Sequence, residues 1–242
     1  MIIKVIGSGS SGNGYLISDG HSQLIIECGI SFKKFQTAVE FELGNLDGIL
    51  ISHEHRDHCK YISYYLHGTY ADVYATKGTI DAMFQDRFLR LKTIEKYRFQ
   101  RLQYKRPVEI GNWKVTAFET QHDVAEPCGF LIDNLKTKER LLFATDTYYV
   151  KYRFNDVTHI MIEANYDKEV IDEYMTQGFD LKRKTRLLES HMSIENTLDF
   201  IKTNKSDKLK EIYLLHLSES NSRAAEFRYR AQRITGVPVY IA

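Results

Sequence analysis

The chain has 242 residues, of which 43% are hydrophobic and 27% are charged, and its formal net charge is +1 at pH 7. This size and composition fit one well-packed domain, so we expect a single domain over residues 1–242. Such a small net charge excludes general attraction to nucleic acid, which would need local basic patches. No apolar run approaches the roughly 20 residues of a membrane span, and the N-terminus lacks a secretory signal pattern, so we expect a cytoplasmic protein without a membrane partner.

Short apolar or alternating runs predict many strands along the chain. In order, these are residues 2–6, 14–18, 23–27, 48–52, 71–75, 107–110, 113–119, 128–133, 140–145, 159–163, 211–216 and 238–241. Helical spacing predicts helices at residues 32–42, 60–66, 77–85, 167–175, 193–204 and 222–234. Ser193 and Ser222 are the expected N-caps of the last two helices. Because helices are distributed among the strands, the expected fold class is α/β, with functional groups on loops at strand ends.

The stretch ISHEHRDHCK at residues 51–60 places three histidines and an aspartate directly after an apolar strand. In its H-x-H-x-D-H pattern, His53 and His55 can turn toward one metal while Asp57 and His58 turn toward a second. Imidazole and carboxylate ligands of this mix suit Zn²⁺, Mn²⁺ or Fe. Polar groups at the end of a buried strand need partners, and metal coordination supplies them.

Other acids and imidazoles also follow predicted strands, as the remaining ligands of a two-metal site should. His122 follows WKVTAFETQ, Asp146 follows RLLFAT and His216 follows EIYLL. These three residues complete the expected ligand set. Glu27, at the end of LIIECG, is expected to lie behind the ligands and to fix the motif loop or a histidine tautomer.

The segment RFLRLKTIEKYRFQRLQYKR, residues 87–106, has eight Lys or Arg, one acid and four interleaved aromatic residues. Basic groups that meet phosphates, beside aromatic faces that stack on bases, would suit a nucleic-acid strand. An amphipathic connector with aromatic residues toward the core and charges toward water has the same pattern. Both interpretations remain open at this stage.

With these motifs in place, the chain resembles the metallo-β-lactamase superfamily over essentially its whole length. The resemblance implies a four-layered αβ/βα sandwich with a dinuclear metal site, in which Asp146 bridges the metals. Glu27 stands where the family usually has Asp. The stretches GSGSSGNGYLI, VYATKGT, IEANYD, ESHMSIEN and LLHLSESNS resemble more narrowly the WalJ/YycJ-type members, described as 5′ to 3′ DNA exonucleases.

The resemblance implies a metal-dependent phosphodiester hydrolase, most simply a DNA exonuclease, with a metal-bridging hydroxide as nucleophile. Two divalent ions are the expected cofactors, Zn or Mn in the first place and Fe as a further option. Asp57 is expected to orient the hydroxide, and His191 to meet the substrate phosphate or protonate the leaving oxygen. Helix capping before residues 193–204 is the other interpretation of His191. Asn221 corresponds to a polar position near the site. The alternative function is hydrolysis of a small substrate, such as a cyclic nucleotide, lactone or thiolester.

Overall fold

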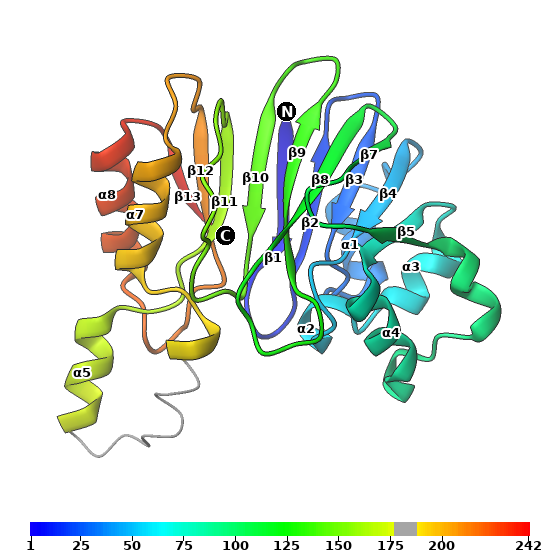
Figure 1. Cartoon of the computed structure of the whole chain (residues 1–242), viewed down its shortest axis with the longest axis horizontal. Coiled ribbons are helices and arrows are strands. Elements are labelled where there is room, and N and C mark those ends of the chain that lie inside the picture. Colours follow the sequence, from blue (N-terminus) through cyan, green and yellow to red (C-terminus); the bar gives the residue numbers. More distant parts are fainter. Residues whose placement is uncertain (177–187) are drawn as a thin grey trace. The chain divides into compact units, whose positions relative to one another are not determined.

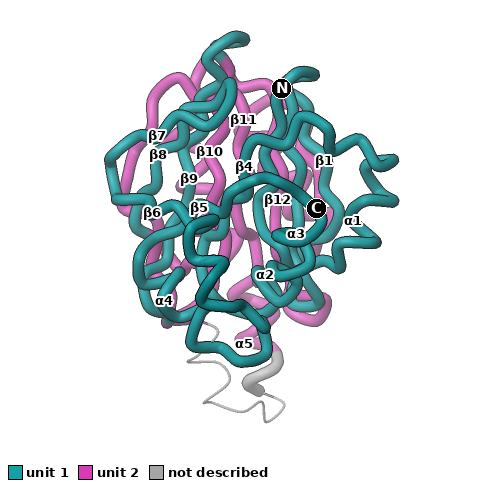
Figure 2. Tube along the Cα trace, turned by 90° about the vertical axis from the view of Figure 1, so that its right-hand side faces the viewer, with its two compact units in different colours: residues 1–119, 124–138 teal, residues 120–123, 139–242 magenta. Residues whose placement is uncertain are grey.

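The computed structural model describes residues 1–176 and 188–242. Its strands form two sheets, one of six strands and one of seven. The chain divides into two compact units, shown in different colours in Figure 2. Unit 1 comprises residues 1–119 and 124–138, and unit 2 comprises residues 120–123 and 139–242. None of the helices in the described ranges is long and apolar enough to cross a membrane.

Unit 1 contains the six-stranded sheet, whose strands follow chain order from one edge to the other. The first three strands are antiparallel, and the last three continue the sheet in parallel register. The strands are β1 (Ile2–Gly7), β2 (Gly14–Ser18), β3 (Gln23–Ile26), β4 (Leu46–Leu50), β5 (Asp72–Thr76) and β6 (Phe99–Leu102). Since β3, β4 and β5 are parallel, the loops after them leave from the same edge of the sheet.

Helices of unit 1 pack on this sheet around one apolar core (Figure 1). They are α1 (Phe32–Ala38), α2 (Arg56–Cys59), α3 (Ile62–Gly68) and α4 (Lys77–Gln85). Phe35, Tyr65 and Met83 bring side chains from three of them into the core, against Ile49 and Val73 of the sheet. Burying each such side chain stabilises the fold by about 1.5–3 kcal/mol. This core holds the loop after β4, where the histidine motif lies, on a rigid base.

The rest of unit 1 is an antiparallel array of β7 (Pro107–Ile110), β8 (Trp113–Glu119) and β9 (Cys128–Asn134). Between β5 and β7 lie two short 3₁₀ helices, η1 (Arg87–Leu89) and η2 (Thr93–Arg98). The turn between β7 and β8 needs glycine at position 111, where φ is +55° and an added Cβ would lie 2.4 Å from the Asp47 carboxylate. The chain therefore turns tightly at Gly111-Asn112 between two antiparallel strands.

Unit 2 contains four parallel strands in the order β13-β12-β11-β10. They are β10 (Arg140–Ala144), β11 (His159–Glu163), β12 (Glu211–Leu215) and β13 (Val239–Ile241), with helices α5 (Lys168–Thr176), α7 (Ile194–Asn204) and α8 (Ala224–Thr235) (Figure 1). The residues of β11 are all buried, as expected of a central parallel strand. The carboxyl ends of β10, β11 and β12 meet at one edge, where Asp146, Glu163 and His216 are found.

Predicted and observed elements differ at several points. The helix expected at 32–42 ends at Ala38 because Glu40 and Phe41 adopt positive φ values of 55° and 62°. Ser193 caps α7 as predicted, by accepting from the Asn196 N–H, but Ser222 does not cap α8. Its hydroxyl instead donates to the Ser218 carbonyl at 2.7 Å, so α8 begins after Arg223. Strand β6 was not predicted.

Candidate metal centre

The histidine motif occupies the loop that leaves β4 and enters α2. His53 and Asp57 lie on either side of His55, whose carbonyl begins the helix by accepting the N–H groups of His58 and Cys59 at 2.9 and 3.1 Å. The loop after β3 supports the motif, since the Cys28 N–H donates to the His58 carbonyl at 2.6 Å. These backbone bonds fix the motif loop before any side chain is considered.

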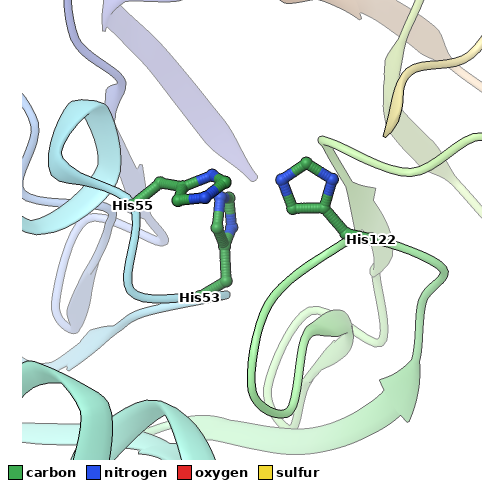
Figure 3. A group of neighbouring side chains, drawn as sticks. All are labelled: His53, His55 and His122. Atoms are coloured by element: carbon green, nitrogen blue, oxygen red, sulfur yellow. The ribbon is translucent and has the colours of Figure 1, made fainter. Parts of the chain in front are cut away.

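The imidazoles of the motif lie close together within unit 1. The ring centroid of His53 is 4.9 Å from that of His55 and 4.1 Å from that of His58. His53 and His58 are buried, whereas His55 is partly exposed. The Ser52 hydroxyl lies 2.9 Å from His53 Nδ1, which leaves Nε2 as the atom directed away from the backbone (Figure 3). Such a buried group of imidazoles is what a transition-metal ligand set requires.

Two polar side chains position His58. Glu27 is fully buried, and its Oε1 lies 3.5 Å from His58 Nδ1 while accepting from the Ser52 N–H at 3.3 Å. Burial raises the pKa of the Glu27 carboxyl, although His58 acts in the opposite direction. On the other side of the ring, Asn13 Nδ2 and Asp57 Oδ2 lie 3.0 and 3.3 Å from Nε2. The His58 ring is therefore held between the Glu27 carboxylate at Nδ1 and the Asn13 and Asp57 side chains at Nε2.

Unit 2 brings together a second group of donors. Asp146, Glu163, His191 and His216 each offer a ligand atom, and these atoms lie within 4.8 Å of one another. Asp146 Oδ1 is 3.5 Å from His191 Nδ1 and 3.7 Å from His216 Nε2. The rings of His191 and His216 stack, with centroids 5.3 Å apart and an interplanar angle of 14°. Three of these four residues were singled out in the sequence.

Glu163 is the member of this group that the sequence analysis missed. It is fully buried, and its Oε1 lies 2.6 Å from His191 Nδ1. Its Oε2 accepts from the Thr147 and Met192 N–H groups at 2.9 and 3.2 Å. Burial raises the pKa of the Glu163 carboxyl, while His191 opposes that change. Glu163 therefore ties the loop that follows Asp146 to the loop that carries His191.

Asn165 was also missed, and it holds His216 from behind. Its Nδ2 donates to the His216 carbonyl at 2.7 Å and lies 3.1 Å from Nδ1 of the same ring. The Glu163 carboxylate is 3.8 Å from that Nδ1. Two buried polar groups thus surround Nδ1 of His216, and Nε2 is the nitrogen that lies toward Asp146.

His122 belongs to the short segment of unit 2 that follows β8. The segment is bonded to the loop after Asp146, since the Gln121 N–H donates to Thr147 Oγ1 at 2.9 Å and Gln121 accepts from the Tyr148 N–H at 3.2 Å. The ring centroid of His122 is 6.0 Å from that of His191. Figure 3 shows His122 on this loop and His53 and His55 on the loop after β4.

Three of the acids and imidazoles at strand ends have left-handed backbones. Glu27, Asp146 and His216 have φ values of 66°, 48° and 52°, and each comes within two residues of the last residue of β3, β10 or β12. Non-glycine residues rarely adopt this conformation, and strained backbones concentrate at functional sites. The reversal of the chain directly after each strand keeps these side chains at the strand end.

The other predicted site residue, Asn221, is buried in a turn before α8. Its N–H donates to Ser218 Oγ at 3.3 Å, and its carbonyl accepts from the Asp167 N–H at 2.8 Å. These backbone bonds give it a structural role, and its part in binding substrate stays a prediction.

The donors of both units are imidazoles and carboxylates, which is the ligand chemistry of Zn²⁺, Mn²⁺ and Fe sites. The family described as "Beta-lactamase superfamily domain" matches residues 23–216. The chain therefore belongs to the beta-lactamase superfamily, and it is a metal-dependent hydrolase. The expected α/β fold class is confirmed. Membership of this superfamily and the presence of the His/Asp clusters support the binding of divalent metal.

Within this superfamily, the chain is similar to proteins named for nuclease activity. It is 28% identical over 230 residues to the exodeoxyribonuclease WalJ of Streptococcus pneumoniae, covering 90% of this chain and 82% of WalJ. It is 28% identical over 226 residues to the exodeoxyribonuclease YycJ of Bacillus anthracis, covering 90% of this chain and 83% of YycJ. Among solved structures, the metallo-β-lactamase fold protein YhfI from Bacillus subtilis superposes with a TM-score of 0.71 at 20% identity, over 99% of this chain and 95% of YhfI.

Proposed function

We propose that this protein is an exonuclease that hydrolyses DNA phosphodiesters at a centre of two divalent metal ions, Zn or Mn. The observation that carries the proposal is the pair of His/Asp clusters at strand ends, one in each unit, in a chain similar to two exodeoxyribonucleases. In this proposal, His53, His55 and His122 would hold the first metal, Asp57, His58 and His216 would hold the second, and Asp146 would be a ligand of both.

The positions of the ring nitrogens support this assignment. In His53, Nδ1 contacts Ser52, and in His58, Nδ1 faces the buried Glu27. Asn165 lies at Nδ1 of His216. In His53 and His216, the polar group at Nδ1 fixes the orientation of the ring and makes Nε2 the candidate metal-binding atom, as is common for metal-bound histidines. In His58, Nε2 lies beside Asn13 Nδ2 and Asp57 Oδ2.

When bound, two divalent ions supply a water-derived nucleophile at neutral pH and neutralise charge on the phosphate that is attacked. Asp57, a quarter exposed at its side chain, would orient this nucleophile. His191, with Nδ1 held by Glu163, presents its other nitrogen to the scissile phosphate and donates a proton to the leaving oxygen. The capping role considered for His191 is filled by Ser193.

The test is a time course on 5′- and 3′-labelled DNA, single- and double-stranded, with Mn²⁺ or Zn²⁺ added. We expect the wild type to release short labelled products, and the label lost first gives the polarity. The variant His55→Ala should bind less metal and cleave little DNA, whereas His21→Ala, which alters an exposed histidine in a turn of unit 1, should match the wild type. DNA left intact by a protein with two bound metals would reject the proposal.

His191 needs a separate variant, because it is proposed to act on substrate and not on metal. His191→Gln should keep the metal content of the wild type while kcat on DNA falls by about 10²–10⁴-fold, the usual contribution of a general acid. Loss of metal from this variant would mean that His191 is a ligand.

A further inference from the structure

Arg56 lies within the histidine motif, but its side chain contacts the segment after α4. Its guanidinium carbon is 3.9 Å from the centroid of the Phe88 ring. Its Nε donates to Asp86 Oδ2 at 3.2 Å, while Oδ1 of the same carboxylate accepts from the Phe88 N–H at 2.9 Å. Asp86 therefore holds the cation and the ring together beside the motif loop.

This pair is open to solvent. The Phe88 side chain is 72% exposed and that of Arg56 54% exposed. The neighbouring Leu89 is only 1% exposed, so the turn itself is anchored in the core of unit 1. A large apolar ring held outward on an anchored turn loses the benefit of burial. Its position is consistent with use as a binding surface.

The charge around the ring is positive. Residues 86–92 include three cations and a single acid, Asp86, which is paired with Arg56. Arg87, Arg90 and Lys92 are exposed, and Arg90 ends the 3₁₀ turn in the left-handed conformation, with φ 57°. We call Arg56, Arg87, Phe88 and Arg90 the Phe88 cluster. It combines a planar aromatic face with cations, which is what a nucleic-acid strand recognises.

Three other residues of the basic segment make structural contacts. The Phe99 ring packs against Phe84 with centroids 4.9 Å apart, and the Tyr104 hydroxyl donates to the Pro127 carbonyl at 2.7 Å. Arg98 donates to Asp72 at 2.9 Å and to backbone carbonyls before β5. The connector interpretation therefore fits Phe99, Tyr104 and Arg98, whereas the nucleic-acid interpretation of residues 87–106 stays a prediction.

We propose that the Phe88 cluster binds single-stranded DNA and leads it to the histidine motif, an inference that rests on the proposed nuclease function. An unpaired base stacks on the face of Phe88 that Arg56 does not cover, while Arg87 and Arg90 contact the phosphates on either side. Each base of a single strand can offer a face to the ring, whereas a duplex offers only its terminal pairs, so the cluster favours single strands over duplexes. Arg56 connects this platform directly to His55 and Asp57, its neighbours in sequence.

The first test compares KM for labelled oligothymidylate between metal-loaded wild type and Phe88→Ala. Loss of one base–aromatic stack should raise KM at least about fivefold. Phe88→Trp should restore a KM close to that of the wild type. The matched control is Tyr70→Ala. Tyr70 is also an exposed aromatic residue, but it lies before the start of β5, whereas α4 and Phe88 follow the end of that strand. A KM for Phe88→Ala equal to that of the control would overturn the inference.

The second test measures how kcat/KM for the same strand depends on salt. Each phosphate contact to a single strand adds about 0.7 to the negative slope of log affinity against log salt concentration. Arg87→Gln and Arg90→Gln should each reduce the slope by about that amount, whereas Lys4→Gln on strand β1 should not. Equal slopes in all four proteins would show that the arginines contact no phosphate.

Failure of this inference can be told apart from failure of the proposed function. If wild type hydrolyses bis(p-nitrophenyl) phosphate but neither binds nor cleaves DNA, both proposals are rejected. If wild type degrades DNA and the Phe88 variants behave as it does, only the Phe88 cluster is rejected. If Phe88→Ala weakens cleavage of blunt duplex as much as cleavage of single strands, the assignment to unpaired bases is wrong.

Discussion

The close approach of Gly29 to the motif loop makes a direct test of how unit 1 builds the site. A Cβ at position 29 would lie 1.6 Å from the Asp57 carbonyl oxygen and 2.6 Å from the Asn13 nitrogen, both of them backbone atoms. To restore an ordinary contact of 3.4 Å, the Asp57 carbonyl has to move by about 1.8 Å. That movement breaks the 2.7 Å bond from the Asn13 N–H to Asp57 and strains the 2.9 Å bond from Gly29 to Asn13.

The variant Gly29→Ala should therefore lose about 3–5 kcal/mol of unfolding free energy, from two backbone hydrogen bonds and an overpacked contact. With a urea slope of about 3 kcal/mol/M, its midpoint should fall by about 1–2 M in the presence of a chelator. Gly44→Ala is the matched control, because a Cβ there meets nothing within 4 Å. Equal midpoints for the two variants would refute the idea that position 29 supports the motif loop. In a competition assay with a chelating indicator, Gly29→Ala should also bind metal more weakly than Gly44→Ala.

Three further predictions follow from contacts and charge. Glu27→Gln should weaken metal binding by about 10–100-fold, as measured by competition with a chelating indicator, because His58 loses the carboxylate behind Nδ1; an affinity equal to that of the wild type would contradict this. Cleavage of DNA should fall steeply with salt while hydrolysis of a small phosphodiester changes little, and a shared shallow response would favour the small-substrate alternative. Burial lowers the pKa of His159 from 6.5 to about 4. Between these two pH values, the imidazole is protonated in the unfolded chain but not in the folded chain. The free energy of unfolding should therefore be constant above about pH 7 and decrease as pH falls from 6.5 to 4. Subtracting the profile of His159→Gln should isolate this loss, and identical profiles would refute it.

The strands and the candidate ligands were accessible from sequence because both depend on local patterns. Buried parallel strands such as β11 are continuous apolar runs, and a histidine or acid directly after such a run stands out. Strand β6 was missed for the opposite reason. It is four residues long, lies at the edge of its sheet and has an exposed Arg101. Its sequence is therefore as short and as irregular in hydrophobicity as that of a connecting loop.

Residues that act through contacts distant in sequence could not be found in this way. Asn13 reaches His58 across 45 positions, and Asn165 reaches His216 across 51. Nothing in the sequence indicates which side chain Asn13 contacts. Glu163 could have been found, since it ends an apolar strand just as Glu27 does.

The left-handed residues at strand ends connect the fold to the site. A non-glycine residue in this region costs about 1 kcal/mol or more, so Glu27, Asp146 and His216 would each be more stable as glycine on backbone grounds alone. The surrounding bonds offset that cost: Glu27 accepts from the Ser52 N–H, Asp146 from the Thr145 hydroxyl at 2.9 Å, and His216 from Asn165. Since glycine would satisfy the backbone but has no donor atom, the acid or imidazole at these positions is explained by what its side chain binds.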